Sequence, residues 1–217
     1  MTKYLAVVLA IGIFGITGCG VRMRIPIWPP SDSQVSEDEE ARKAHFIFGQ
    51  LAAENGDLAT AIEELRPLAE TGHVLAQGTL GSIYANGGRG VPQNDKEAVK
   101  GYRLAAEQGH VLAQYDLGVM YATARGVSQD DKEAVKWFRL AAEQRHVKAQ
   151  YNLGVMYAIG AGVPQDNIQA YMWLSLAINE IPRARQIRDK VSAKMAPSEI
   201  AKAQRLVREW QVAKARN

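Results

Sequence analysis

A segment of about 36 residues recurs along the chain, and this repetition constrains the fold more than any other feature. Residues 110–121 return as residues 146–157, 36 positions later, and residues 73–84 match them 37 positions earlier. Self-similarity at such a period is typical of arrays in which each unit buries its apolar face against its neighbours. The sequence therefore predicts a repeat architecture.

Each copy has the pattern of two helices joined by a loop. In the first half of the last copy, one helical face carries Ala149, Leu153, Gly154 and Tyr157. The small residues Ala and Gly on this face allow the second helix to approach the first closely. We expect Leu and Tyr at these positions to fill the gap between neighbouring units. The second half and the loop recur as well, as shown by Ala98, Ala134 and Ala170, by Leu104, Leu140 and Leu176, and by the Gly-Val pairs that begin at Gly90, Gly126 and Gly162.

Capping residues predict where these helices begin and end. Asp95, Asp131 and Asn167 are placed to cap the N-termini of the second helices. Gly72 and Gly109 suit the left-handed residue that ends a helix, and Arg145 takes that place in the next copy.

The pattern A-x-x-x-L-G-x-x-Y…G-V-x-x-D-x-x-x-A…W-x-x-x-A-A-x-x-G resembles Sel1-like repeats, relatives of the tetratricopeptide repeat, over about residues 41–180. The resemblance implies an all-α fold, an α-solenoid of antiparallel helix pairs that forms a right-handed superhelix with a C-terminal helical cap. The expected units are a divergent one at 37–72 and three close copies at 73–109, 110–145 and 146–180, followed by capping helices in 181–217.

The N-terminal residues predict that the protein is located in the cell envelope. Lys3 precedes the apolar run Leu5 to Ile16, whose twelve residues span about 18 Å as a helix, short of the ~30 Å bilayer core. The run leads to Ile16-Thr17-Gly18-Cys19, which resembles a bacterial lipobox and implies a lipoprotein signal peptide at 1–18 and lipidation of Cys19. The alternative is an ordinary cleaved signal with an incidental cysteine.

The residues after the cysteine predict a tether. Residues 19–36 contain Pro26, Pro29 and Pro30, which favour extended chain, and Ser36 with Glu39 forms a capping-box pattern at the expected first helix. By resemblance to lipoproteins, Gly20 is compatible with delivery to the periplasmic side of the outer membrane.

The residues predict neither an enzyme nor a cofactor or metal site. Three of the four histidines share one position at the turn between the two helices of successive copies: His73, His110 and His146. Equivalent positions in stacked helices lie about 10 Å apart, which is too far for one zinc ion to bridge. We therefore expect these histidines to be solvated turn residues. No phosphate-binding loop, nucleophile elbow or H-E-x-x-H motif is present. The net charge of +3 is too small to indicate a nucleic-acid partner.

The resemblance implies a scaffold or adaptor that binds an unidentified protein or peptide through the concave face of the repeats, anchored to the membrane through lipidated Cys19. By analogy with tetratricopeptide repeats, Tyr115, Val119, Tyr151 and Val155 are expected to contact the partner. The alternative for the two tyrosines is packing between units.

The C-terminal segment allows a second function. Residues 181–217 hold ten Lys and Arg against three acids, whereas residues 19–180 hold fifteen against twenty. A structural envelope lipoprotein would contact peptidoglycan or anionic lipid through these basic helices. A solvated polar face is the simpler interpretation of the same charges.

The lipobox gives a direct test. Replacement Cys19→Ser removes the thiol that would receive the lipid, so we expect a soluble or unprocessed precursor without acyl label. Metabolic labelling with a radioactive fatty acid measures this; label that persists in the variant would refute the assignment.

Overall fold

The computed structural model describes residues 32–215 of the 217-residue chain, and these form ten helices and no strand. Contacts divide the chain into residues 1–39 and residues 40–217, and the second unit, which holds the repeats, is described by itself. The helices are α2 (Asp32–Glu54), α3 (Leu58–Glu70), α4 (Val74–Asn86), α5 (Asp95–Glu107), α6 (Val111–Ala122), α7 (Asp131–Glu143), α8 (Val147–Ile159), α9 (Asn167–Ala177), α10 (Pro182–Ser192) and α11 (Pro197–Ala215).

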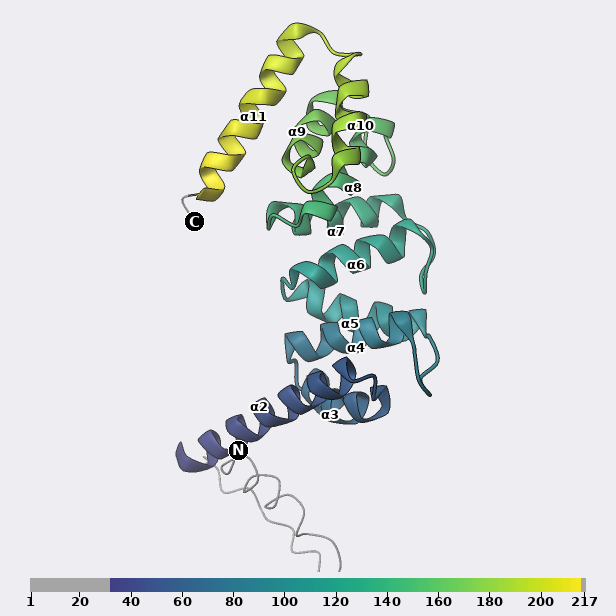
Figure 1. The fold of residues 1–217 in the computed structure, drawn as a ribbon, viewed down its shortest axis with the longest axis vertical. Helices are drawn as coiled ribbons and strands as arrows, with labels where there is room; N and C mark the ends of the chain where they lie inside the picture. Colours follow the sequence, from purple (N-terminus) through teal and green to yellow (C-terminus); the bar gives the residue numbers. More distant parts are fainter. Residues whose placement is uncertain (1–31, 216–217) are drawn as a thin grey trace, which may run out of the picture. The chain divides into compact units, whose positions relative to one another are not determined.

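The helices pair and stack in chain order, as the repeat predicts. The first and second helix of each close copy pack together as α4 with α5, α6 with α7 and α8 with α9. The second helix of each unit then packs on the first helix of the next, so α3 contacts α4, α5 contacts α6 and α7 contacts α8 (Figure 1). The predicted all-α solenoid is confirmed.

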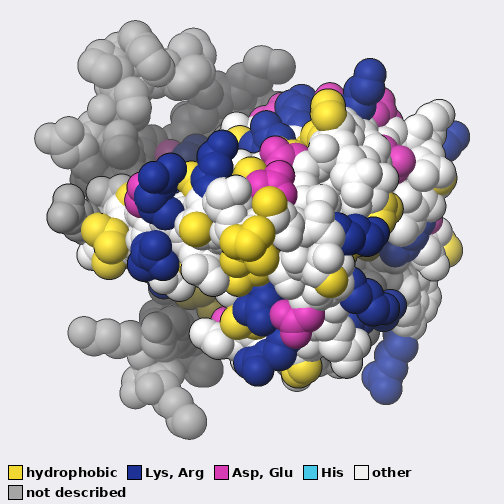
Figure 2. Space-filling model, turned by 90° about the horizontal axis from the view of Figure 1, so that it is seen from above, with side chains coloured by type: hydrophobic (Ala, Val, Ile, Leu, Met, Phe, Trp, Pro, Cys, Tyr) yellow, Lys and Arg dark blue, Asp and Glu magenta, His cyan; other side chains and the backbone are white. Residues whose placement is uncertain are grey.

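Two further helices follow the repeats, and both α10 and α11 pack on α9, the last second helix. Trp210 of α11 meets Trp173 of α9 edge to face, with ring centroids 6.2 Å apart. Lys and Arg side chains are spread over this end of the solenoid, with hydrophobic side chains between them (Figure 2).

The core is a series of separate clusters at the junctions between units. Leu117 of α6 is fully buried among the alanines of α5, and Leu153 of α8 is fully buried among those of α7. Within each unit a glycine brings the two helices close together. A Cβ added at Gly118 would lie 2.7 Å from the Phe138 ring, and Gly49, Gly81 and Gly154 face Leu65, Tyr102 and Leu174 in the same way.

The turn after α7 shows how the array tolerates a departure from its pattern. Gly72 and Gly109 adopt left-handed φ angles of +93° and +89°, as predicted, and Arg145 adopts +71° at the same position. Arg145 thus keeps the geometry of the turn, although a left-handed backbone conformation costs free energy for a residue that has a Cβ atom. The turn itself does not change.

Several helix starts differ from those predicted. The caps of α5, α7 and α9 are Asn94, Asp130 and Asp166, one residue before the Asp95, Asp131 and Asn167 that we expected. Each pair of neighbours contains two good capping side chains, so the pattern alone does not choose between them. In all three helices the earlier residue of the pair is the one whose side chain caps the first turn.

The first described helix also starts earlier than predicted, and the last helix starts at a proline. Helix α2 begins at Asp32 rather than at Ser36, and no Pro or Gly stands between Pro30 and Gly49 to interrupt it. Helix α11 begins at Pro197, and its first turn is capped by Glu199, whose carboxylate accepts from the Ala196 N–H at 2.8 Å. Ser198 therefore lies within the helix and is not its cap.

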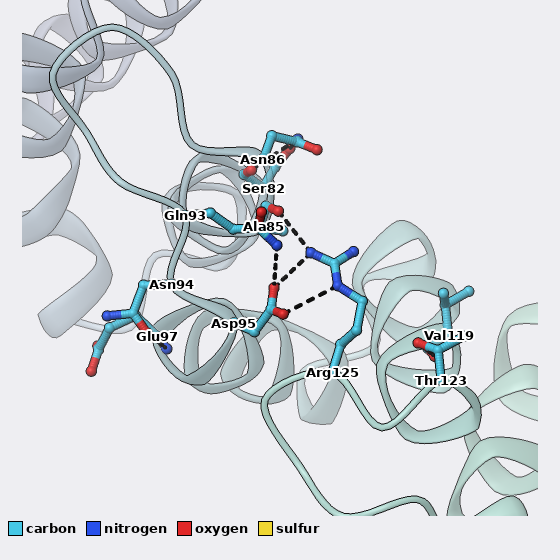
Figure 3. A network of polar contacts seen from close by, with 10 residues as sticks. All are labelled: Ser82, Ala85, Asn86, Gln93, Asn94, Asp95, Glu97, Val119, Thr123 and Arg125. Atoms are coloured by element: carbon cyan, nitrogen blue, oxygen red, sulfur yellow. Dashed lines mark hydrogen bonds and ion pairs between the residues drawn. The ribbon is translucent and has the colours of Figure 1, made fainter.

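The loop between α6 and α7 is tied to the preceding unit. Arg125 forms a bidentate ion pair with Asp95 at the start of α5, with distances of 2.6 and 3.2 Å, and donates to the Ala85 carbonyl of α4 at 2.8 Å (Figure 3). The next residue, Gly126, has φ +69°, and an added Cβ would lie 2.2 Å from the Asp95 carbonyl oxygen. Only glycine fits this approach.

The predicted signal peptide, Cys19 and most of the tether lie outside the described residues. Among the described helices, none has the length and apolar character needed to cross a membrane.

Stability should depend on the junction leucines. Leu117→Ala and Leu153→Ala each leave a cavity between units, so each should lower the free energy of unfolding by about 2–5 kcal/mol. The matched control is Leu112→Ala, because Leu112 of α6 is 56% exposed and its loss should change stability by less than about 0.5 kcal/mol. Urea titration followed by circular dichroism measures all three; equal losses would contradict this placement of the core.

Candidate functional site

The sequence predicts partner binding on the first helices of the close copies, α4, α6 and α8, and we call the side of the solenoid that these helices line the inner side. Helix α4 contacts α6 directly, so neighbouring first helices approach each other at this boundary between units.

One position on this inner side carries a different polar residue in each unit. Thr79 of α4, Asp116 of α6 and Asn152 of α8 stand two residues before their Gly, and all three are half-buried. Since the units repeat, these side chains form a row along the first helices, which we call the inner row. Its members share polarity but not charge.

The predicted binding residues Tyr115 and Val119 are largely used in packing. The Tyr115 ring lies 4.5 Å from the His146 ring and 5.9 Å from that of Phe138, measured between centroids. Val119 packs on the same cluster, which belongs to α7 and α8. Both side chains remain partly exposed.

Tyr151 and Val155 belong to a different cluster. Both are half-buried and pack against residues of α9 and α10, such as Leu174 and Ala184. The structure therefore divides the four predicted residues between two junctions, which agrees with the packing interpretation of the tyrosines. Their part in binding a partner stays a prediction.

Asp116 is the most perturbed carboxyl group on the inner side. Burial raises the pKa of Asp116 to about 6, and the positive charge of Lys148 on α8 offsets part of that shift. Asp116 forms no ion pair within the described residues. Its charge in turn adds to the effect of burial on Tyr102, whose pKa is raised to about 12.

The turn histidines are structural caps and not merely solvated residues. His73, His110 and His146 stand just before α4, α6 and α8, and the Nδ1 atom of each accepts the backbone N–H three residues later at 3.2 Å. This role requires a neutral ring nitrogen with a free lone pair. No group of three or more metal-binding side chains occurs among the described residues.

A ladder of buried glutamines, which was not predicted from the sequence, also joins the units. Gln77, Gln114 and Gln150 are almost fully buried, and each donates to a carbonyl near the end of the preceding second helix, at 2.9–3.2 Å. The Gln114 oxygen accepts from Gln144 of the same unit at 2.8 Å, as that of Gln77 accepts from Gln108 at 2.7 Å. The recurrence of Gln within an apolar helix was the available signal.

Comparison with known proteins identifies the repeats. The family profile described as Sel1 repeat matches residues 74–110, 111–146 and 147–180. The crystal structure of a Sel1 repeat protein from Oxalobacter formigenes is similar, with 27% identity and a TM-score of 0.60 over 80% of this chain and 73% of the other. No curated protein matches this chain.

A second crystal structure is that of a protective antigen present in uropathogenic Escherichia coli strains, which displays an SLR fold. It has 26% identity and a TM-score of 0.53, and the match covers 82% of this chain. The chain spans about half the length of that protein, 47%.

The histidine caps make stability depend on pH. Burial lowers the pKa of His110 and His146, and Lys148 adds to the effect at His146. In the unfolded chain the pKa of histidine is about 6.5, so above that pH each ring contributes its full stabilisation. As the pH falls from about 6.5 toward the lowered pKa of the folded state, the unfolded chain binds protons first and this stabilisation is lost.

We expect His110→Asn with His146→Asn to remove this dependence, because Asn caps a helix without titrating. The measurement is urea titration of both proteins from pH 7.5 to 5, and the difference in free energy of unfolding should shift in favour of the variant as pH falls. Asp116, with its raised pKa, acts in the opposite direction in both proteins and cancels in the difference. A difference that stays constant with pH would contradict the role assigned to the caps.

Proposed function

Since residues 74–180 of this chain are three consecutive Sel1 repeats, we propose that it is a scaffold or adaptor that binds a protein or peptide through the inner side of the solenoid. Helical solenoids offer extended surfaces of this kind, built from equivalent positions of successive units. The proposed partner is an extended segment that runs along the first helices α4, α6 and α8.

The inner row is the observation that carries this proposal. Thr79, Asp116 and Asn152 occupy equivalent positions, so hydrogen-bonding groups recur at about one helix diameter, ~10 Å, along one side. A half-buried carboxyl without an ion pair, such as that of Asp116, has unused capacity to accept from a ligand. The exposed parts of Tyr115 and Tyr151, with Val119 and Val155, would border the row.

The location proposed for this scaffold is the cell envelope. The lipobox that ends in Cys19 supports a lipid anchor, and Gly20 supports the periplasmic side of the outer membrane. Residues 20–31 would then separate the anchor from the first described helix. The solenoid would be held close to the membrane with its inner side free.

The basic C-terminal helices support a second candidate function. Arg188 and Arg205 pair with neighbouring acids, but most basic side chains of α10 and α11 are exposed and lie outside these pairs. The exposed basic residues outside these pairs are Arg183, Arg185, Lys190, Lys202 and Arg208 on the two helices and Lys194 in the turn between them. A surface of this charge suits anionic polymer or lipid, so the chain would be a structural lipoprotein.

A capture experiment tests the scaffold proposal. The immobilised chain is incubated with an envelope extract, and bound proteins are identified by mass spectrometry. The variant Asp116→Lys with Asn152→Lys should lose the captured protein, with an affinity reduced at least about tenfold, because two long cations replace the polar row. The control Ser128→Lys with Glu143→Lys adds the same charge at exposed positions and should retain it.

Two outcomes would contradict the proposal. If both variants capture the same protein as the parent chain, the inner row does not form the binding site. If the chain is retained only on isolated sacculi or on phosphatidylglycerol vesicles, and releases at high salt, the structural lipoprotein is favoured.

A further inference from the structure

Helix α2 ends the array with an apolar surface that is left open in the described part of the chain. Ile47, Phe48 and Leu51 are 53%, 56% and 50% exposed, whereas the other first helices each have a single large apolar side chain of comparable exposure, Leu75, Leu112 or Ile159. Their spacing places them on one side of the helix. We call these three residues the α2 face.

Packing within the units fixes which positions these residues occupy. Gly49 of α2 faces Leu65 of α3 as closely as Gly118 faces Phe138 and Gly154 faces Leu174. Leu65, Phe138 and Leu174 occupy equivalent places in their second helices, so Gly49 holds the repeat position of the other glycines. The register of α2 against the array follows from this match.

Two residues of the α2 face, Phe48 and Leu51, therefore hold junction positions, whereas Ile47 holds the position of the inner row, two residues before its glycine. Phe48 precedes Gly49 as Leu80, Leu117 and Leu153 precede their glycines, and those leucines are at most 8% exposed. Leu51 corresponds to Ile83, Met120 and Met156, which are also at most 8% exposed. In every complete unit these positions are covered by the second helix of the preceding unit.

The covering helices share a chemistry. In α5 and α7 the contacting surface consists largely of alanines, which let the two backbones approach. Each helix carries one alanine and then two more, seven and eight residues later: Ala98, Ala105 and Ala106 in α5, and Ala134, Ala141 and Ala142 in α7. A helix of this pattern is the natural occupant of a junction surface.

A folded second copy of the chain does not offer such a helix. The junction faces of α3, α5 and α7 are already covered by the next first helix, and α10 and α11 cover α9. Terminal units of a solenoid normally carry a polar outer face. The C-terminal end has the polar helices α10 and α11, whereas the α2 face presents Ile, Phe and Leu.

We propose that the α2 face is a docking surface for an amphipathic helix of a partner protein, one that carries alanines at the spacing found in α5 and α7. The docked helix takes the place of the missing preceding second helix and continues the stack. Its junction residues Phe48 and Leu51 lie outside the inner row, so the proposal does not depend on the proposed function.

The probe for this site is a synthetic peptide of residues 130–144, which contains α7 and its cap. Its affinity for the purified full chain is measured by fluorescence anisotropy of a label on the peptide. We expect saturable binding that falls at least about tenfold for Phe48→Glu with Leu51→Glu. The same peptide with Ala141→Glu should bind equally poorly.

A matched variant separates the α2 face from apolar exposure in general. Leu112→Glu with Leu140→Glu changes two leucines of α6 and α7 that are 56% and 37% exposed, and it should bind the peptide as the parent chain does. Circular dichroism and the thermal midpoint show that each variant is folded. No binding by the parent chain, or equal loss in both variants, overturns the proposal.

Other occupants give different results, each of which overturns the proposal. If the chain self-associates in analytical ultracentrifugation and Phe48→Glu with Leu51→Glu abolishes this, a second copy covers the face. If the peptide binds only after residues 1–31 are removed, the preceding segment covers it. If phosphatidylethanolamine vesicles bind the parent chain but not the variant, the occupant is lipid.

Discussion

The contact between the second helix of one unit and the first helix of the next is the interaction on which the structure depends. Leu117 and Leu153, two of the four leucines that are completely buried in the described part of the chain, lie at these junctions, each within a core cluster of its own. A unit alone would leave this face in water, although its two helices also pack on each other where a glycine lets them approach. Stability is therefore a property of neighbours, and a defect at one junction weakens two units at once.

The same junctions explain why the array tolerates buried polar groups. The last carbonyls of a helix lack intrahelical partners, and Gln114 and Gln150 donate to such groups at the ends of α5 and α7. A slip of one residue between the two helices would leave the buried amide unpaired, at about 1–3 kcal/mol, whereas the carbonyls of Ala106 and Ala142 would keep the backbone N–H of Gly109 and Arg145. Hydrophobic packing provides most of the attraction, while the glutamine ladder sets the register.

The sequence predicted the parts of the fold that follow from periodicity, and it failed where the choice depends on neighbouring helices. The repeat positions of Leu153 and Gly154 implied a junction and a close approach, and both are present. The choice of Asn94 over Asp95 as a cap depends on how the loop closes, which the pattern does not contain. Tyr115 was placed on the correct helix, but the aromatic ring of His146 that covers it comes from the next unit.

Comparison of the units with one another separates packing positions from available ones. The glutamine ladder, the histidine caps and the leucine before each glycine keep their identity in all three close copies, because every junction imposes the same requirement. The inner row changes from Thr79 to Asp116 to Asn152, although its members hold equivalent places. A position that varies while its surroundings repeat is not fixed by the junction. Under the proposed function, the side chains available to specify a partner are those by which the units differ, and the inner row is one such set on the first helices.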